Sequence, residues 1–432
     1  MNEIRGCEPE ALFSPEDIKE GAELEFSCCV HKIKKRSGFT FVTLRTGRYT
    51  FLAVHNPKWC EKPLKNVFEG VYIKVKCMVR AEIKAENGLE IAITDYDIIS
   101  KPHEKYTMSV SDRVLDLSPE EIAEGRCLSF RNPMERAPML VYSAVVDSYC
   151  EFMKKNGFVY VRTPMFTKLG PEDDKDSFAV EYFGEKAYLC SDPSLYLQQS
   201  LAYFDRVYDV SKVFFGKKRN SPRLLNEYTS LQLQMCHIND QEDIMNIMVS
   251  ILKHIVGYVS NQCSYELGLL DAMVPQVQTI PRIDFAEAME ILGKTEPQAD
   301  LDPTDEKRIC AWAKEKTGCE FVFVSFLPGE KRPFYYAQNE DGATKSFVLL
   351  FRGMEIASGG ERINDYCRQM ERMKALDMNS QSFDSYTDYH KFGLSRHGGL
   401  GIGVERFVMQ LLGLKNVREA SVFPRDIHIL KP

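Results

Sequence analysis

The first hundred residues contain short runs in which apolar and polar side chains alternate. Five such runs, rich in β-branched and aromatic residues, occupy positions 24–33, 39–45, 49–54, 71–83 and 89–99. Alternation with a period of two predicts half-buried β-strands. Turn-forming sequences such as RSG, FEG and ENG separate the runs. Five short strands in so small a segment predict a small β-barrel.

The pattern changes after this segment. Residues 103–130 lack a steady period and predict a hinge, with SPEE at 118–121 as a helix start. Helical spacing of apolar residues follows from 134 to 158, and further helical stretches lie at 240–268 and 285–293. Strands are interspersed without a regular βαβ rhythm, which predicts an α+β domain on an antiparallel sheet. We therefore predict a barrel domain at 1–102, a hinge at 103–130 and a larger domain at 131–432.

The composition is that of an ordinary globular protein, with 44% hydrophobic and 27% charged residues. No run of about 18 apolar residues occurs, so we expect no transmembrane helix and no membrane partner. The N-terminal stretch resembles neither a secretory signal nor a transit peptide. The 13 cysteines form no CxxC pair, which argues against zinc or disulfide frameworks and indicates reduced thiols. We expect a cytoplasmic protein.

The net charge of −7 argues against a protein that binds nucleic acid by bulk electrostatics. The N-terminal part is more basic, and the sequence HKIKKR at 31–36 concentrates that charge. Either a solvated strand end or a nucleic-acid contact explains it. A five-stranded barrel of this size suits an OB-fold, which commonly stacks single-stranded bases on exposed aromatics beside basic residues.

The sequence HGGLGIGVERFVMQLLGLKNVREASVFPRD at 397–426 carries the strongest local signal. Glycines let a flat base or a phosphate approach the backbone, although tight packing alone would also explain them. A fixed arginine at a helix start is suited to phosphate oxygens. The whole string resembles motif 3 of class II aminoacyl-tRNA synthetases in its aspartyl form. The resemblance places Gly403 and Arg406 in the ATP site, with Arg406 on the γ-phosphate.

The stretch RPFYYAQNEDGATKSFVLLFRGMEIASGGERINDY at 332–366 resembles archaeal/eukaryotic-type aspartyl-tRNA synthetases. The resemblance implies that Glu355 and Ser358 hold the Mg²⁺ that bridges ATP phosphates. It also implies that Arg362 reads the side-chain carboxylate of the amino acid. Oxygen ligands suit a hard cation, and a planar guanidinium suits a carboxylate. The alternative for Glu355 and Arg362 is an internal salt bridge.

Three further segments resemble the same family. FVYVRTP at 158–164 is similar to motif 1, which implies that Pro164 lies at the interface of a homodimer. LGPEDDKDSF at 169–178 is similar to the loop that closes over substrate and offers Glu172 for the amino group. A charged surface turn is the alternative for that loop. AYLCSDPSLYLQQ at 187–199 occupies the position of the amino-acid pocket.

The segment 206–235 occupies the position of motif 2. Arg223, Glu227 and Tyr228 match the family here, which implies a catalytic role for Arg223 and ATP binding for Glu227 and Tyr228. The Tyr228 ring would stack on adenine, whereas without this context a half-buried aromatic is simply a core residue.

The barrel resembles the anticodon-binding domain of the family. Phe41 would stack on an anticodon base, beside Lys34 and Lys35, and Glu90 is a candidate hydrogen-bond partner. For Phe41, simple packing is the alternative. One stretch, YTDYHKFG at 386–393, looks more like the asparaginyl branch.

Several positions depart from the family. The motif 2 string Phe-Arg-x-Glu reads Phe214-Phe215-Gly216-Lys217, so the arginine for the α-phosphate and the glutamate that helps to fix ATP are missing. The other departures are Leu224 for histidine, Val348 for a metal-holding aspartate, Ser194 and Leu197 for a glutamine and a lysine around aspartate, and Arg396 for a proline. Loss of one transition-state contact typically costs roughly 10²–10³ in rate.

The leading hypothesis is an aspartyl-type aminoacyl-tRNA synthetase that uses ATP and Mg²⁺, binds tRNA and aspartate, and forms a homodimer. The motif 2 losses motivate a second hypothesis, a paralogue without aminoacylation activity that binds tRNA or a nucleotide. The altered pocket motivates a third, a ligase that activates another carboxylate, of the asparaginyl or amide-forming type.

Overall fold

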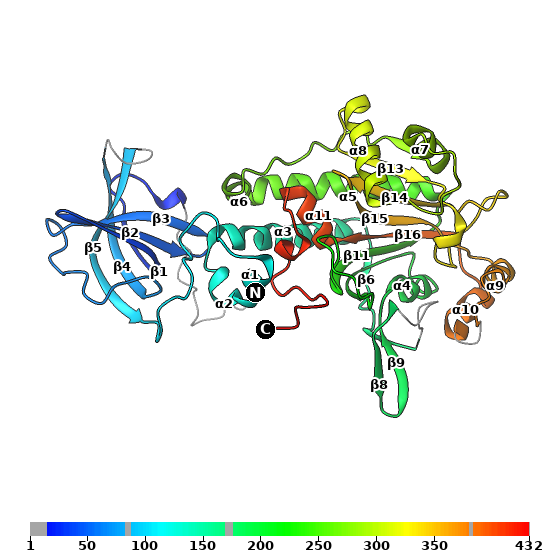
Figure 1. Ribbon diagram of the computed structural model, residues 1–432, viewed down its shortest axis with the longest axis horizontal. Helices are drawn as coiled ribbons and strands as arrows, with labels where there is room; N and C mark the ends of the chain where they lie inside the picture. Colours follow the sequence, from blue (N-terminus) through cyan, green and yellow to red (C-terminus); the bar gives the residue numbers. More distant parts are fainter. Residues whose placement is uncertain (1–14, 83–87, 169–175, 380–382, 432) are drawn as a thin grey trace. The chain divides into compact units, whose positions relative to one another are not determined.

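The computed structural model describes residues 15–82, 88–168, 176–379 and 383–431. The chain folds into two compact units, one made of Met1–Ser118 with Gly125–Arg136 and the other of Pro119–Glu124 with Ala137–Pro432 (Figure 1). The hinge that we predict at 103–130 is divided between these units, and its function as a hinge stays a prediction. No helix in the described part of the chain combines the length and apolarity needed to cross a membrane.

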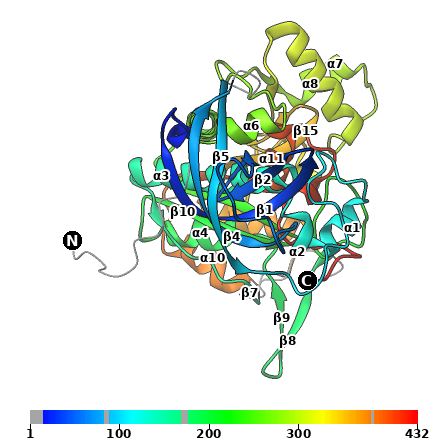
Figure 2. The ribbon, with the colours of Figure 1, turned by 90° about the vertical axis from the view of Figure 1, so that its left-hand side faces the viewer.

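The first unit contains a closed barrel with the strand order β1-β2-β3-β5-β4 (Figure 2). Its strands are β1 (Glu23–Arg36), β2 (Phe39–Thr46), β3 (Tyr49–His55), β4 (Tyr72–Ala81) and β5 (Leu89–Ser100). Strand β4 shows how the pattern produces the barrel: Ile73, Val75, Cys77 and Val79 point inward and are almost fully buried, and the residues between them are exposed. The predicted barrel is confirmed.

An eight-stranded sheet forms the centre of the second unit, in the order β12-β13-β14-β15-β16-β11-β10-β6. Its neighbours pair antiparallel, except that β12–β13 and β10–β6 pair parallel. The predicted α+β class is confirmed. The strands are β6 (Val159–Tyr160), β10 (Arg206–Phe214), β11 (Glu227–Cys236), β12 (Arg282–Asp284), β13 (Phe321–Ser325), β14 (Ser346–Phe351), β15 (Met354–Glu361) and β16 (His397–Gly403), and a smaller sheet holds β7 (Phe166–Thr167), β8 (Ala179–Tyr182) and β9 (Glu185–Leu189).

Helices α3, α5 and α11 supply the apolar residues that cover one face of this sheet. Helix α5 begins where predicted because Asp240 caps it, accepting a hydrogen bond from the Glu242 N–H at 2.9 Å. The helices are α1 (Pro119–Glu124), α2 (Arg126–Ser129), α3 (Pro133–Lys155), α4 (Ser194–Ser200), α5 (Gln241–Gln262), α6 (Ser264–Leu269), α7 (Phe285–Leu292), α8 (Pro303–Thr317), α9 (Tyr366–Ala375), α10 (Asp384–Lys391) and α11 (Val404–Leu412).

The strand predicted across 159–166 is wrong in extent, because β6 ends at Tyr160 and β7 belongs to the smaller sheet. A buried carboxylate explains the interruption. Asp209 accepts hydrogen bonds from the Thr163 N–H at 3.1 Å and from the Thr163 hydroxyl at 2.6 Å. The Thr163 N–H is therefore not available for strand pairing, and Pro164 has no N–H to donate. The strand ends for these two reasons.

Candidate active site

A cavity of about 480 Å³ lies on the face of the large sheet opposite the main core. Strand β11 shows why, because successive side chains of a strand point to opposite faces. Leu231 and Leu233 are fully buried in the core formed with the helices. Tyr228, Ser230 and Gln232 point the other way and line the cavity.

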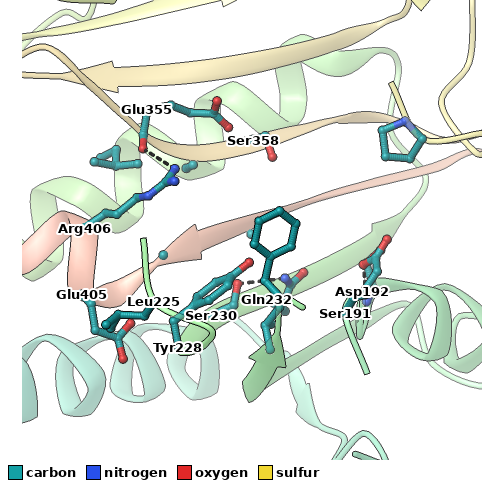
Figure 3. Close-up of a pocket in the computed structure, with 18 of the residues that line it drawn as sticks. Ser191, Asp192, Leu225, Tyr228, Ser230, Gln232, Glu355, Ser358, Glu405 and Arg406 are labelled. Carbon is teal, nitrogen blue, oxygen red and sulfur yellow. Dashed lines mark hydrogen bonds between the residues drawn. The ribbon is translucent and has the colours of Figure 1, made fainter. Parts of the chain in front are cut away.

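Seven residues singled out from the sequence line this one cavity, and Figure 3 labels four of them, Tyr228, Glu355, Ser358 and Arg406. They come from the loop before β11, from β11 itself, from β15 and the residue after it, and from the junction of β16 with α11. They are Arg223, Tyr228, Glu355, Ser358, Arg362, Gly403 and Arg406.

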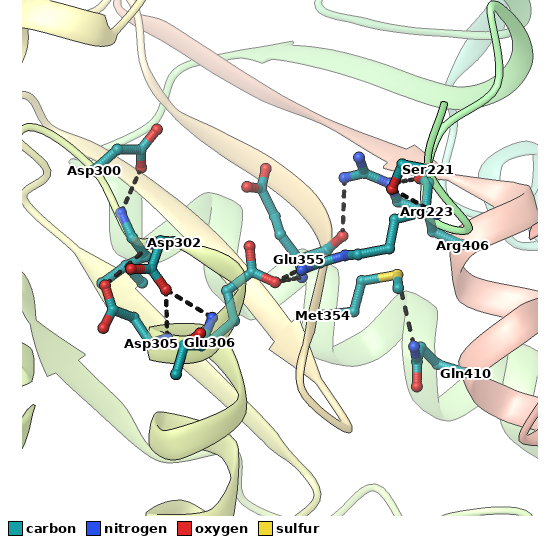
Figure 4. Close-up of polar contacts among 12 residues, drawn as sticks. Ser221, Arg223, Asp300, Asp302, Asp305, Glu306, Met354, Glu355, Arg406 and Gln410 are labelled. Carbon is teal, nitrogen blue, oxygen red and sulfur yellow. Dashed lines mark hydrogen bonds and ion pairs between the residues drawn. The ribbon is translucent and has the colours of Figure 1, made fainter. Parts of the chain in front are cut away.

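Arg406 belongs to the first turn of α11, and two backbone carbonyls hold its side chain from two sides. Its Nε donates to the Arg223 carbonyl at 3.2 Å, and its Nη1 donates to the Glu355 carbonyl at 3.2 Å (Figure 4). None of the ion pairs in the described part of the chain involves this guanidinium. The cation is therefore fixed in place, and its charge is available to an anionic ligand.

Arg223 differs from Arg406 because it forms an ion pair with Glu306 of α8 (Figure 4). The Glu306 side chain is almost fully buried and also accepts a hydrogen bond from the Glu355 N–H at 3.2 Å. Nη1 of Arg223 is buried and has no hydrogen-bond partner among the described residues. This nitrogen is therefore a donor that the described residues do not use.

Glu355 and Ser358 reach the same cavity through a β-bulge. They are three positions apart, a spacing that puts side chains on opposite faces of a regular strand. The pairing of β15 with β14 skips Ile356, so that one extra residue lies between Glu355 and Ala357. Both oxygen-bearing side chains consequently line the cavity.

These two residues fit a magnesium ion that also contacts phosphates. Burial raises the pKa of the Glu355 carboxyl, against the opposing effect of the nearby Arg406. The described hydrogen bonds of Glu355 use its backbone, which leaves its carboxylate for another ligand. The described residues form no cluster of three or more metal-binding side chains. Two protein oxygens suit Mg²⁺, which usually keeps waters and substrate phosphates as its other ligands.

The glycines of β16 serve two purposes. A Cβ atom at Gly399 would lie 2.2 Å from Gln234 Oε1, and one at Gly401 would lie 2.6 Å from Gln232 Nε2, so these positions are glycine because of packing. A Cβ atom at Gly403 would meet nothing closer than the Ile356 carbonyl at 3.8 Å. Packing does not require a glycine there, and Gly403 borders the cavity.

Arg362 is a buried cation that forms no ion pair within the described residues, so the salt-bridge alternative for it is not what the structure contains. Its side chain is 3% exposed. The guanidinium lies over the Tyr336 ring at 4.2 Å and the Tyr335 ring at 4.8 Å. Nη2 donates to the Gly399 carbonyl at 3.3 Å, whereas Nε and Nη1 have no partner in the described part of the chain. Two donors therefore remain for an anionic ligand.

Three predicted site residues lie elsewhere. Glu227 does not line this cavity, because its carboxylate pairs with Lys212 at 3.4 Å beside a second cavity of about 370 Å³. Pro164 is exposed in the loop after β6. Glu172 falls within 169–175, outside the described residues.

Most of the positions that depart from the family fall into one of two groups. Phe215, Leu224 and Ser194 line the cavity, so those substitutions change its walls. Leu197 and Val348 are buried in apolar clusters. Outside both groups, Lys217 pairs with Asp176 at 3.5 Å, and Arg396 forms a two-pronged pair with Glu361 at 2.7 and 3.1 Å.

The barrel carries its candidate residues on its outer face. Cross-strand pairing puts Lys34 opposite Phe41, Phe41 opposite Val54 and Val54 opposite Ala92. Glu90 is two residues before Ala92 on β5 and so faces the same way. The register therefore brings Lys34, Phe41 and Glu90 onto one side of the barrel.

Glu90 is already engaged within the barrel. Arg80 Nε donates to its carboxylate at 2.7 Å, and the Arg80 guanidinium lies 3.9 Å above the Trp59 ring. Lys35, like Lys34, is exposed near the end of β1.

The sequence interpretation missed Asp192 and Glu306, which belong to the site through the fold. Asp192 lines the cavity within the segment that we assign to the amino-acid pocket. Its only local signal is the Asp-Pro-Ser helix start. Glu306 gives no signal at all, because α8 is far from motif 2 in sequence and meets Arg223 only in the folded chain.

Glu405, next to Arg406 in the sequence, has a buried carboxyl group, and burial disfavours its charged form. Its side chain is 3% exposed, and its two oxygens accept from the Thr229 N–H at 3.1 and 3.0 Å. Burial raises the pKa of Glu405 from its ordinary value of 4.5 to about 7. Between these values the folded chain binds more protons than the unfolded chain, so stability falls as pH rises through this window.

We expect the substitution Glu405→Gln to remove this pH dependence, worth about 3 kcal/mol between pH 5 and pH 8. Urea unfolding measures it best in a Trp59→Phe background, where Trp312 of α8 is the remaining tryptophan. An equal loss of stability on raising the pH in both proteins would show that Glu405 is not the group responsible.

Comparison with known proteins identifies the family of the chain. Residues 118–427 match the family described as tRNA synthetases class II (D, K and N). The chain is 36% identical over 364 residues to an aspartate–tRNA(Asp/Asn) ligase of Thermus thermophilus, covering 83% of this chain and 86% of the relative. It is 31% identical over 427 residues to the Methanopyrus kandleri aspartate–tRNA(Asp/Asn) ligase, covering 96% and 97%.

Solved structures share the fold over nearly the whole chain. The asparaginyl-tRNA synthetase of Pyrococcus horikoshii complexed with asparaginyl-adenylate superimposes with a TM-score of 0.88 at 23% identity, covering 98% of this chain and 100% of the other. The aspartyl-tRNA synthetase of Entamoeba histolytica gives 0.86 at 22% identity, covering 100% and 95%. The resemblance drawn from the motifs is confirmed: the chain belongs to the class II tRNA synthetases of the D, K and N family.

Proposed function

We propose that the chain is an aspartyl-type aminoacyl-tRNA synthetase, which activates aspartate with ATP and transfers it to tRNA. The observation that carries the proposal is the meeting of Arg406, Glu355 and Arg362 in one cavity. These residues provide phosphate, metal and carboxylate contacts of the kind that adenylation needs. The relatives named aspartate–tRNA(Asp/Asn) ligases support the choice of aspartate.

In this proposal each end of the cavity has its own task. The half-buried Tyr228 ring would stack on adenine, and Arg406 would bind the terminal phosphate. Arg362 would hold the side-chain carboxylate of aspartate through Nε and Nη1. The α-carboxylate could then attack the α-phosphate and release pyrophosphate, and a hydroxyl at the 3′ end of tRNA would take the acyl group and release AMP. Orientation of the two substrates supplies a large part of such catalysis.

Glu355 and Ser358 would hold Mg²⁺. When bound, the ion supplies positive charge to the phosphates and orients them for in-line displacement.

The apolar wall at Phe215 favours a second candidate, a paralogue that binds nucleotide or tRNA without turnover. Phe215 lines the cavity where the family has the arginine for the α-phosphate. The third candidate, a ligase for another carboxylate, rests on Ser194, which lines the amino-acid end of the cavity.

ATP–pyrophosphate exchange with a panel of amino acids separates the three. Exchange that depends on aspartate supports the proposal. Exchange only with another carboxylate, such as asparagine, supports the third candidate. No exchange, with retained binding of ATP or tRNA, supports the second.

The barrel is the part of the chain that we propose for the tRNA anticodon. We expect Phe41→Ala to weaken tRNA binding by about 5–150-fold, since stacking on an aromatic is worth roughly 1–3 kcal/mol per base. Leu52→Ala is the matched control, because Leu52 of β3 is an exposed apolar residue on the same outer face of the barrel as Phe41. Equal affinities for both variants in a filter-binding titration would remove Phe41 from the interface.

Salt dependence tests the two lysines in the same assay. Replacing Lys34 and Lys35 with alanine should lower the slope of log affinity against log salt by about 1.4, or roughly 0.7 per lost phosphate contact. An unchanged slope would place the tRNA backbone elsewhere.

We propose a homodimer built around the exposed edge strand β6. Val159 and Tyr160 are 41% and 50% exposed, and Met165 and Phe166 beyond Pro164 are 44% and 51% exposed. Apolar side chains gathered at an unpaired sheet edge are typical of an interface. Sedimentation at micromolar concentration tests the proposal. Family membership favours a location in the cytoplasm.

A further inference from the structure

Helix α8 carries a carboxylate on the face that it buries. Ile309, Cys310 and Ala313 of this face pack into an apolar cluster with residues of β13 and β14. Glu306 lies three, four and seven positions before them, so it belongs to the same face of the helix. The residue is only 7% exposed. A charge in such a place lowers stability unless a partner compensates it.

One oxygen of Glu306 has two partners. Its Oε2 forms the ion pair with Nη2 of Arg223 and also accepts the hydrogen bond from the Glu355 N–H at 3.2 Å (Figure 4). Glu355 directly precedes Ile356, the extra residue of the β-bulge. A single carboxylate oxygen thus joins a cation of the loop before β11 to the strand that carries the proposed metal ligand.

Arg406 completes a closed ring of hydrogen bonds with Arg223, Glu306 and Glu355. Its Nε donates to the Arg223 carbonyl and its Nη1 to the Glu355 carbonyl, each at 3.2 Å. Arg223 and Glu355 are therefore linked twice, once through the Arg406 guanidinium and once through the Glu306 carboxylate. Because each member of the ring is bound to two others, none of the four shifts without breaking a hydrogen bond.

We infer that Glu306 is a positioning residue for ATP, which acts through Arg223 and keeps the two arginines of the ring at a fixed spacing for the terminal phosphates. The inference rests on the proposed function and adds to it a residue that does not itself line the cavity. Nη2 of Arg223 is bound to Glu306, whereas Nη1 is a donor that the described residues do not use. The carboxylate therefore orients the guanidinium and leaves a donor for phosphate. Without Glu306, ordering the Arg223 side chain would reduce the affinity for ATP.

The second hydrogen bond argues against a carboxylate that only occupies Arg223 until a phosphate displaces it. A displaced Glu306 would lose the Glu355 N–H as well. Its charge would then remain on the buried face of α8 without a partner, which is strongly unfavourable. The geometry therefore favours an ion pair that stays intact when ATP binds.

Calorimetric titration of the full chain with ATP and with AMP, both in the presence of Mg²⁺, tests the inference. AMP lacks the terminal phosphates, so the ratio of the two affinities isolates their contribution. We expect the wild type to prefer ATP by about 10–100-fold, as for hydrogen bonds between charged groups. In Glu306→Gln this preference should fall by about tenfold, while the affinity for AMP stays within about threefold of the wild type.

Asp305→Asn is the matched control for a purely structural effect. Asp305 is the neighbouring residue of α8, is 1% exposed and pairs with Lys294 at 2.6 Å, but it is not a member of the ring. Its replacement should lower thermal stability, as Glu306→Gln does, because both changes break a buried ion pair. The ratio of ATP to AMP affinity should nevertheless stay within about threefold of the wild type.

A double-mutant cycle shows whether Glu306 acts through Arg223. In an Arg223→Gln background, Glu306→Gln should change the ratio by less than about threefold, because the guanidinium that it orients is gone. A change as large as in the wild-type background contradicts the inference. Glu306→Asp keeps the charge but withdraws it by one methylene, and it replaces Glu306→Gln if that variant does not fold. It should lower the ratio by about threefold.

The remaining outcomes separate the inference from the proposed function. An equal loss of both nucleotides in Glu306→Gln, an unchanged ratio, or a ratio above that of the wild type would overturn the inference. A wild type that binds ATP and AMP equally would also overturn it, although aspartate-dependent exchange would still support the proposed function. A wild type that binds neither nucleotide would overturn both.

Discussion

Replacing Arg406 by alanine is expected to reduce aspartate-dependent ATP–pyrophosphate exchange by about 10²–10³-fold, the typical effect of losing one fixed charge contact to the reacting phosphates. The guanidinium is held by the Arg223 and Glu355 carbonyls at 3.2 Å each and forms no ion pair among the described residues. It is therefore ready to bind a phosphate without reorganising. Arg406→Lys should recover only a small part of the rate, because a mobile ammonium lacks the planar fork of N–H donors with which a guanidinium binds phosphate oxygens.

A control must separate this effect from a loss of structure. Arg352 also binds backbone carbonyls, those of Gln410 and Met273 at 2.9 Å each, but it lies outside the cavity. Arg352→Ala removes similar structural bonds and should change exchange by no more than about threefold, whatever its effect on thermal stability. If both variants lost activity in parallel with stability, Arg406 would be a structural residue rather than a phosphate ligand.

The second large effect is a gain. Phe215→Arg should raise the exchange rate by about 10²-fold, because it returns a cation to the wall of the cavity where the α-phosphate is expected. The backbone around this position is well fixed. The Phe215 N–H donates to the Asn226 carbonyl at 2.9 Å, and the Gly216 N–H donates to the Asp176 carbonyl at 2.9 Å. A side chain at 215 should therefore enter the cavity as the phenyl ring does.

Phe215→Leu controls for the removal of the ring. It keeps the wall apolar and should leave the rate within about threefold of the wild type, since no charge contact changes. A Phe215→Arg variant with no gain, from a wild type without exchange, would favour the paralogue that binds without turnover. Steady-state exchange at saturating ATP gives the comparison, because it reports the chemical step rather than binding.

Much of the fold follows from local patterns. The barrel strands are visible because β4 alternates for its whole length, and its inward residues Ile73 and Val75 recur with a period of two. Helix α5 is visible because Asp240 caps a long apolar-periodic stretch. The strand expected across 159–166 fails because a distant carboxylate, Asp209, takes the hydrogen bonds of Thr163. No local signal carries that information.

The candidate site likewise combines features that the local sequence reveals with features that only the folded chain creates. Arg406 and Gly403 stand in a run of glycines that the sequence alone marks as unusual, and both line the cavity. The shared orientation of Glu355 and Ser358 depends on a bulge at Ile356, which alternation would not predict.

Long-range contacts account for the rest. The ion pair between Arg223 and Glu306 joins segments that are distant in sequence. Glu227 is next to Tyr228, yet adjacent strand residues point to opposite faces. Only Tyr228 therefore lines the main cavity, and Glu227 pairs with Lys212 instead.

A crystal structure of the chain with ATP, Mg²⁺ and aspartate tests the central claim most directly. We predict a nucleotide in the cavity, with its base on Tyr228, its terminal phosphate on Arg406 and a metal ion at Glu355, and aspartate at Arg362. A cavity that stays free of nucleotide at saturating ATP, or a nucleotide bound elsewhere on the chain, would contradict the account.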